Sequence, residues 1–171
     1  WDLQSASDGR FVLGLGTQVR GHNERRFSVP WSAPGPRMRE YIQALRSIWQ
    51  CWKTGEKLQF EGKHYNFSLM TPAFVPEVMA APPPAITIGA VGPAMLRVAA
   101  EMCDGVRLHP FCTKRYQENV VLPIMLAGLE KAGRARDGFE ITGGGFIATG
   151  ADEAAVEERL AWVRQRVAFY G

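Results

Sequence analysis

The sequence has few cysteines and none of the spacings on which cysteine chemistry depends. Cys51, Cys103 and Cys112 are the only three, and no two of them form a C-x-x-C pair. The pattern therefore favours neither a zinc site nor a disulfide framework. A reduced compartment fits this usage, so we expect a cytoplasmic protein.

Long hydrophobic runs and a strong charge of either sign are also missing. No apolar segment reaches the roughly 20 residues that a membrane span requires, and no signal-peptide pattern is present. The net charge of +3 over 171 residues is too small to indicate nucleic-acid binding. The one basic cluster, Arg20, Arg25 and Arg26, is interpreted first as a solvated loop. We expect neither a nucleic acid nor a membrane as partner.

Signatures of hydrolases and nucleotide triphosphatases are absent as well. There is no Ser/His/Asp order, no metal-ligand cluster and no glycine-lysine phosphate loop. The composition is nevertheless that of an ordinary globular protein, with 46% hydrophobic and 22% charged residues. The chain is long enough for a single domain with a real core, and we predict one domain over residues 1–171.

The most informative stretch is 85–105, AITIGAVGPAMLRVAAEMCDG. A short β-branched run, 85–88, predicts a buried strand. A turn of small residues follows, and Pro93 suits the first position of the next helix, which needs no N–H. Free backbone amides and a helix dipole at such a turn can bind a phosphate-like anion. The turn can equally be an ordinary strand–helix connection, because a short glycine motif is weak evidence.

Hydrophobic periodicity predicts the remaining elements. Strands are expected at 10–16, 105–108 and 140–150, the last with its better half at 146–149. Helices are expected at 37–54, closed by Gly55, at 114–132, and after Asp152. The helix at 114–132 is capped by Thr113, kinked by Pro123 and closed by Gly133. Its expected inward positions are Tyr116, Val120, Ile124 and either Leu126 or Ala127. Residues 56–84 read as an inserted hairpin and a proline-rich segment, and the loop 17–36 is long enough to suggest a function.

Four strand–helix units in alternation predict a parallel sheet covered by helices. A doubly wound sheet and a TIM-type (β/α)8 barrel both fit this order. A complete barrel needs about 250 residues, so about four βα units amount to half of one. We therefore expect an α/β protein with parallel strands, and more specifically a partial barrel, a fragment of a longer chain.

Two motifs resemble a known family. RFVLGLGT at 10–17 and ITIGAVGPAMLRVAAEMCDGV at 86–106 are similar to the luciferase-like flavin oxidoreductases, as is the ending TGADEAAVEERL. That superfamily contains FMN-dependent monooxygenases and oxidoreductases that use the deazaflavin coenzyme F420. The loop GTQVRGHNERRF favours the F420 branch. The resemblance implies a TIM-type barrel of which this chain supplies roughly strands four to seven, together with a homodimer.

The resemblance also implies a cofactor site at the carboxyl ends of the strands. The family binds the cofactor phosphate through amides of the loop that matches Gly89, Ala90, Val91 and Gly92. Thr17 is then placed to reach the phosphate or ribityl chain. Arg20 is the nearest candidate for the basic side chain that luciferase-type members carry after the first matching strand, although a solvated arginine fits equally well.

His109, at the end of the strand 105–108, is the candidate catalytic residue because it could donate to a bound ring or act as a general acid. A structural histidine in a loop is the alternative. The sugar-phosphate dehydrogenase branch has a catalytic Glu where this chain has Val19, so a sugar-phosphate substrate is disfavoured. No metal site is expected.

The implied function is hydride transfer between F420 and a small organic substrate that the sequence does not identify. An FMN-dependent monooxygenase is one alternative. A half-barrel that is catalytically inert on its own is another, since the other units of such a barrel carry parts of the site. A nicotinamide-binding domain is disfavoured, because Glu101 and Asp104 follow the glycine turn too closely.

Overall fold

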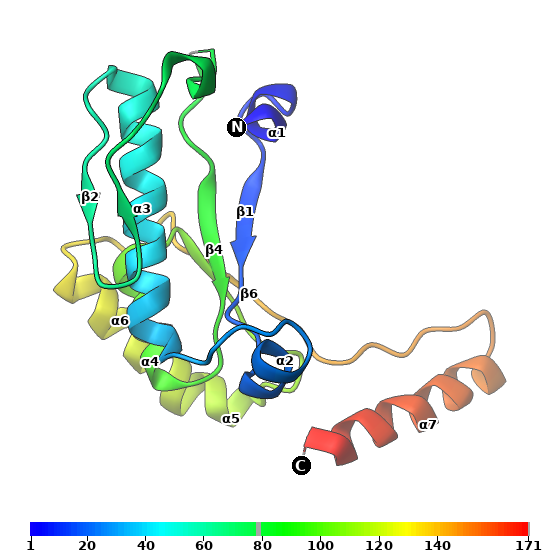
Figure 1. Ribbon diagram of the computed structural model, residues 1–171. Helices are drawn as coiled ribbons and strands as arrows, with labels where there is room; N and C mark the ends of the chain where they lie inside the picture. Colours follow the sequence, from blue (N-terminus) through cyan, green and yellow to red (C-terminus); the bar gives the residue numbers. More distant parts are fainter. Residues whose placement is uncertain (78–79, 171) are drawn as a thin grey trace.

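The computed structural model describes residues 1–77 and 80–170. Four strands form one parallel sheet in the order β1-β4-β5-β6. They are β1 (Val12–Leu15), β4 (Ala85–Gly89), β5 (Gly105–Arg107) and β6 (Glu140–Thr142). Each neighbouring pair runs parallel, and the arrows of β1 and β4 point the same way in Figure 1. The parallel α/β architecture expected from the sequence is therefore confirmed.

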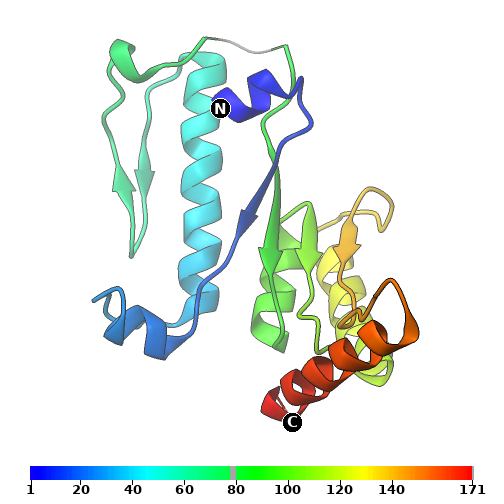
Figure 2. The ribbon, with the colours of Figure 1, turned by 90° about the vertical axis from the view of Figure 1, so that its right-hand side faces the viewer.

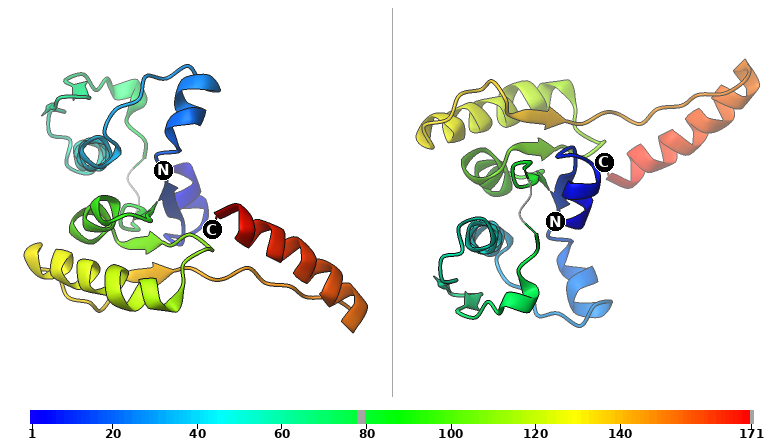
Figure 3. Two further views of the ribbon diagram at one scale, coloured as in Figure 1. Left: turned by 90° about the horizontal axis from the view of Figure 1, so that it is seen from below. Right: turned by 90° about the horizontal axis from the view of Figure 1, so that it is seen from above.

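Three helices cover one face of this sheet: α3 (Pro34–Thr54), α4 (Pro93–Met102) and α6 (Leu122–Lys131). They form an arc outside the strands when the molecule is seen along the sheet (Figure 3). The side views show the opposite face of the sheet uncovered by helices (Figure 2). Three short helices lie outside this layer: α1 (Asp2–Ala6) before β1, α2 (Arg20–Arg25) between β1 and α3, and α5 (Lys114–Tyr116) after β5. Helix α7 (Glu153–Tyr170) stands apart, with no buried residue.

The two faces of the sheet differ in chemistry because successive side chains alternate between them. On the helix side, Ile86, Ile88 and Val106 are fully buried. The strand registers place glycines, threonines and charged residues on the other face, which remains open. These residues are Gly14, Thr87, Gly89, Gly105, Arg107, Glu140 and Thr142, and the apolar Val12 and Ala85 lie on this face as well. Burial of the apolar side chains therefore fixes which face carries the helices.

The predicted hairpin is present between α3 and β4. Strands β2 (Phe60–Glu61) and β3 (Asn66–Phe67) pair in antiparallel fashion, and a short 3-10 turn, Pro72–Phe74, follows. Glu40 of α3 holds the hairpin, since its Oε1 accepts the amides of His64 at 2.6 Å and Tyr65 at 2.7 Å. Residues 78 and 79 of the predicted 56–84 segment lie outside the described residues.

Several predicted elements differ from the structure. The loop expected at 17–36 contains α2, and α3 begins at Pro34 instead of residue 37. The helix expected at 114–132 is divided into α5, a π-helical turn (Gln117–Val121) and α6. Pro123 has no N–H for the carbonyl one turn back and crowds it, and the wider turn accommodates this. The strand expected over 140–150 is only Glu140–Thr142, and 146–149 lie in a loop. Its partner β5 ends at Arg107, so no described neighbouring strand continues the pairing.

The amino ends of the strands are held by a polar cluster around the C-D-G turn. Asp104 Oδ2 accepts the Ile86 amide at 2.8 Å, and Arg134 donates to the carbonyls of Ala100 and Cys103. Burial raises the pKa of the Cys103 thiol to about 12, so this cysteine is an inert part of the core. The hydrogen bonds at this edge therefore stabilise the sheet.

No helix among residues 1–77 and 80–170 is long and apolar enough to cross a bilayer.

Candidate functional site at the carboxyl ends of the strands

The turn between β4 and α4 presents backbone amides at the carboxyl edge of the sheet. Gly92 precedes the first helical residue, Pro93, and its φ of −85° is ordinary. Within the described residues, neither the Val91 amide nor the Gly92 amide donates to a protein acceptor. The side chain of Tyr116 fixes the turn, because its hydroxyl donates to the Val91 carbonyl at 2.9 Å. These two amides and the positive end of α4, called here the β4 cradle, suit an anion.

One member of the predicted set of donors, the Ala90 amide, already has a backbone partner in the structure. The Ala90 amide donates to the Arg107 carbonyl at 3.1 Å and continues the pairing of β4 with β5. The Ala90 side chain is buried, with 3% of its surface exposed. Ala90 is therefore part of the sheet edge, and a bound phosphate would find its donors at Val91 and Gly92. The sequence could not show this, because it depends on how far the pairing of two strands extends.

Thr17 and Arg20 follow β1, which pairs with β4. Because β1 runs parallel to β4 and Leu15 lies opposite Ile88, the residues that follow Leu15 emerge at the same edge of the sheet as the cradle. Thr17 lines a pocket there, and its carbonyl accepts a hydrogen bond from the Asn23 side chain at 3.0 Å. Arg20 forms an ion pair with Glu24 at 3.0 Å and is 70% exposed. Its placement matches the solvated alternative considered for this arginine.

His109 lies beyond the end of β5, on the other side of β4 from Thr17. Its Nδ1 accepts the Phe111 amide at 3.0 Å, which leaves Nε2 as the nitrogen able to face a ligand. The ring of Tyr170 from α7 packs edge-on at 4.6 Å. His109, Ala90 and the cradle residue Val91 line one small cavity of about 20 Å³. His109 and the cradle therefore adjoin one another.

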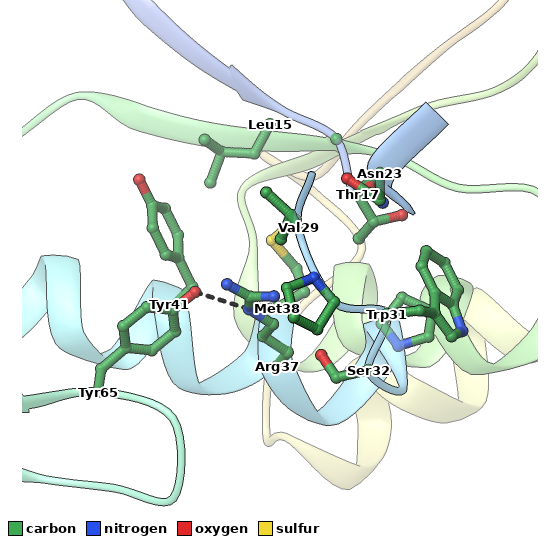
Figure 4. A pocket seen from close by; sticks show the side chains of 13 residues that line it. Leu15, Thr17, Asn23, Val29, Trp31, Ser32, Arg37, Met38, Tyr41 and Tyr65 are labelled. Carbon is green, nitrogen blue, oxygen red and sulfur yellow. Dashed lines mark hydrogen bonds between the residues drawn. The ribbon is translucent and has the colours of Figure 1, made fainter. Parts of the chain in front are cut away.

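The larger cavity at this edge has a volume of about 260 Å³ and lies between the end of β1 and the start of α3. Figure 4 shows aromatic and polar side chains around it. They include Thr17, Trp31, Ser32, Arg37, Tyr41 and Tyr65. We call this cavity the β1–α3 pocket. A second cavity, of about 300 Å³, includes Asp104 and opens at the amino ends of the strands, where βα barrels place stabilising residues.

Sequence reasoning missed most of the polar groups in the β1–α3 pocket. The unusual length of the 17–36 loop was a usable signal for Trp31 and Ser32. Arg37 was assigned only to a helix, and Tyr65 lies in the hairpin, 28 residues further along the chain. No spacing rule joins such positions. Within residues 1–77 and 80–170, no three His, Cys, Asp or Glu side chains gather as metal ligands.

Comparison with known proteins places this geometry in a family. Residues 1–171 match the luciferase-like monooxygenase family. The uncharacterized protein Rv1360 of Mycobacterium tuberculosis is 48% identical over 171 residues, which are all of this chain and 50% of that protein. The F420-dependent glucose-6-phosphate dehydrogenase of Nakamurella multipartita is 34% identical over 135 residues, 79% of this chain and 38% of that protein. The chain thus spans half or less of the length of these relatives.

A solved structure shows the same fold. The monooxygenase RslO1 from Streptomyces bottropensis superposes with a TM-score of 0.73 at 21% identity, and the match covers 98% of this chain and 49% of that one. The four parallel strands and their helices therefore correspond to about half of a luciferase-like barrel, as the sequence resemblance implied. On the family match and the shared fold together, this chain belongs to the luciferase-like monooxygenase family.

Proposed function

We propose that this chain forms the phosphate-binding part of an oxidoreductase that transfers a hydride by means of coenzyme F420. The observation that carries the proposal is the β4 cradle, where the amides of Val91 and Gly92 at the start of α4 have no acceptor in the described part of the chain. The 34% identity to an F420-dependent dehydrogenase supports F420 as the cofactor. The substrate of that relative does not transfer, because Val19 replaces the expected acid.

The residues of the cradle fit a phosphate group. A Cβ built on Gly92 meets no atom within 4 Å, so open space lies beside its backbone. Backbone amides and the helix dipole would bind the anion without using a charged side chain. F420, when bound, supplies a ring that accepts or gives up a hydride at carbon. The protein's part is to hold that ring in place and to keep water away from it.

His109 is the residue that we propose for proton transfer. Its Nδ1 accepts the Phe111 amide, which orients the imidazole and leaves Nε2 able to hold or donate a proton. It adjoins the cradle at the small cavity that Ala90 and Val91 also line. A ligand anchored at the cradle could therefore present its substrate to Nε2.

An FMN-dependent monooxygenase is the second candidate, and the match to the luciferase-like monooxygenase family supports it. The cradle would serve FMN in the same way, since FMN also carries a phosphate. Titrating the chain with F420 and with FMN separates the two candidates. If neither cofactor binds at micromolar concentrations, the chain by itself is the inert half-barrel considered from the sequence.

The test of the cradle is a pair of glycine substitutions. Gly92→Asp places a carboxylate in the space beside the amides, and we expect it to weaken cofactor binding at least about tenfold through repulsion of the phosphate. Gly145→Asp is the matched control, because a Cβ at Gly145 also meets no atom within 4 Å. Equal affinity of the Gly92→Asp variant and the unmodified chain, measured by calorimetry, would remove the cradle from the site.

A further inference from the structure

The β1–α3 pocket has polar groups that the proposed function does not use. Its volume of about 260 Å³ lies just below the roughly 300–1,000 Å³ that encloses a drug-sized ligand. It can therefore hold a small molecule but not a whole three-ring cofactor. It is also on the far side of β4 from His109, because β4 lies between β1 and β5 in the sheet.

Arg37 is the one charged residue among those that line this pocket. Its Nε donates to the Tyr65 hydroxyl at 3.0 Å, and its guanidinium carbon lies 5.8 Å from the centre of the Tyr65 ring. No carboxylate lies within 4 Å of Arg37 in the described part of the chain. Glu40, three positions on, directs its carboxylate to the amides of His64 and Tyr65 instead. A positive charge therefore faces the cavity with its terminal N–H groups free of an acid.

The walls of the pocket suit a flat apolar body. Tyr41 and Tyr65 meet edge to face with their centres 5.5 Å apart, and Trp31 lines the cavity from the preceding loop. Figure 4 shows the Arg37 guanidinium near the hydroxyl of Tyr65, with Trp31 on the other side of the pocket. Aromatic side chains in such walls favour ring-containing ligands.

Ser32 adds an unused hydrogen-bonding group. Its Oγ is buried and has no hydrogen-bond partner among the described residues. A buried hydroxyl without a partner is costly, and a ligand oxygen would satisfy it. The pocket thus combines an arginine without an acid, an unpartnered hydroxyl and aromatic walls, contributed by α3, the 26–33 loop and the hairpin.

We propose that the β1–α3 pocket is a binding site for a small aromatic carboxylate, whose acid group pairs with Arg37 and accepts from Ser32 while its ring packs against the aromatic walls. Arginine forms charge-assisted, bidentate hydrogen bonds with carboxylates, and this geometry selects the anion over its neutral analogue. The proposal does not depend on the redox cofactor, because none of these residues belongs to the β4 cradle.

Benzoate and its neutral analogue benzamide test the proposal on the chain itself. We expect benzoate to bind at least about tenfold more tightly by calorimetry. The Arg37→Gln variant should lower this preference to about one while it still binds benzamide. Arg26→Gln is the matched control, because it removes the same charge from the neighbouring loop without touching the pocket. Of the five tryptophan indole signals in an NMR spectrum, that of Trp31 should shift most.

Several results would overturn the proposal. These are equal affinity for the two compounds, no saturable benzoate binding, an unchanged preference in Arg37→Gln, or an equal loss in Arg26→Gln. If Arg37→Gln does not fold, two measurements on the unmodified chain still test the proposal. These are its preference for benzoate over benzamide and whether the indole signal that shifts most is that of Trp31. Benzoate should also bind in the presence of saturating F420, and competition between them would assign the pocket to the cofactor. Benzoate binding without any cofactor binding would contradict the proposed function alone.

Discussion

A single carboxylate, that of Glu101, connects the three helices that cover the sheet. Glu101 lies on α4. Its Oε2 pairs with Arg39 of α3 at 2.6 Å, and its Oε1 pairs with Lys131 of α6 at 3.0 Å. Only 10% of the Glu101 side chain is exposed. Burial by itself would raise the pKa of this carboxyl, but the hydrogen bonds from Lys131 and Arg39 outweigh it and lower the pKa below the ordinary 4.5. The ionised form is therefore the one that stabilises the fold.

We expect Glu101→Gln to lower the free energy of unfolding by about 1–3 kcal/mol at pH 7, because hydrogen bonds to a charged group are lost. Since the folded pKa is the lower one, this contribution is present above pH 4.5 and is lost as the pH falls through the folded pKa. Urea titrations from pH 7 to pH 3 measure it. The difference between the variant and the unmodified chain should shrink in acid.

Glu118→Gln is the control for this prediction. Glu118 pairs with Lys114 at 3.7 Å, but its side chain is 55% exposed, so its removal should change stability by at most about 0.5 kcal/mol. Equal effects of the two substitutions, or a Glu101→Gln effect that does not vary with pH, would contradict the role given to Glu101.

Residues whose structure depends on local chemistry were predictable from the sequence. Thr113 Oγ1 accepts the Tyr116 amide, and Asp152 Oδ1 accepts the Ala155 amide, as their positions before helices indicated. Gly55 ends α3 in the left-handed conformation, with a φ of +72°. The pairing of Arg37 with Tyr65 was not predictable, because it depends on where the hairpin packs against α3.

At the scale of elements, the π-helical turn decides which side of α6 is buried. The sequence favoured Tyr116, Val120 and Ile124 as the inward positions, and these are only half buried. Val121, Met125 and Leu129 are buried to 2% exposure or less. An extra residue in the turn before Pro123 rotates the helix, so the inward face shifts by one position. Periodicity counted from Thr113 could not include that extra residue.

Met125→Ala and Leu126→Ala test this shift with neighbouring residues. Met125 is fully buried, so its truncation should cost about 2–5 kcal/mol through lost contacts and a cavity. Leu126, which the sequence offered with Ala127 as an inward position, is 51% exposed, and its truncation should cost at most about 0.5 kcal/mol. Denaturant unfolding of the two variants gives the comparison. A larger loss in Leu126→Ala would contradict the observed register.

At the scale of the whole molecule, the sheet is covered on one face only. Parallel sheets are ordinarily covered on both faces, and the chain spans half or less of the length of the relatives compared here. The parallel α/β class followed from alternating strands and helices in the sequence, and the half-barrel followed from the family resemblance. The position of the cofactor site stays a prediction. The short length of β6 and the course of α7 could not be predicted from the sequence, because each depends on the segments that pack beside it. A homodimer stays a prediction.

The central claim is that the amides of Val91 and Gly92 hold the phosphate of a redox cofactor. The most direct measurement compares the affinity of the chain for F420, or for FMN, with its affinity for the same ring system lacking the phosphate. The account predicts that the phosphate-bearing form binds at least about tenfold more tightly, and that Gly92→Asp removes this advantage. Equal affinity for the two forms, with the ring alone binding as well as the cofactor, would contradict it.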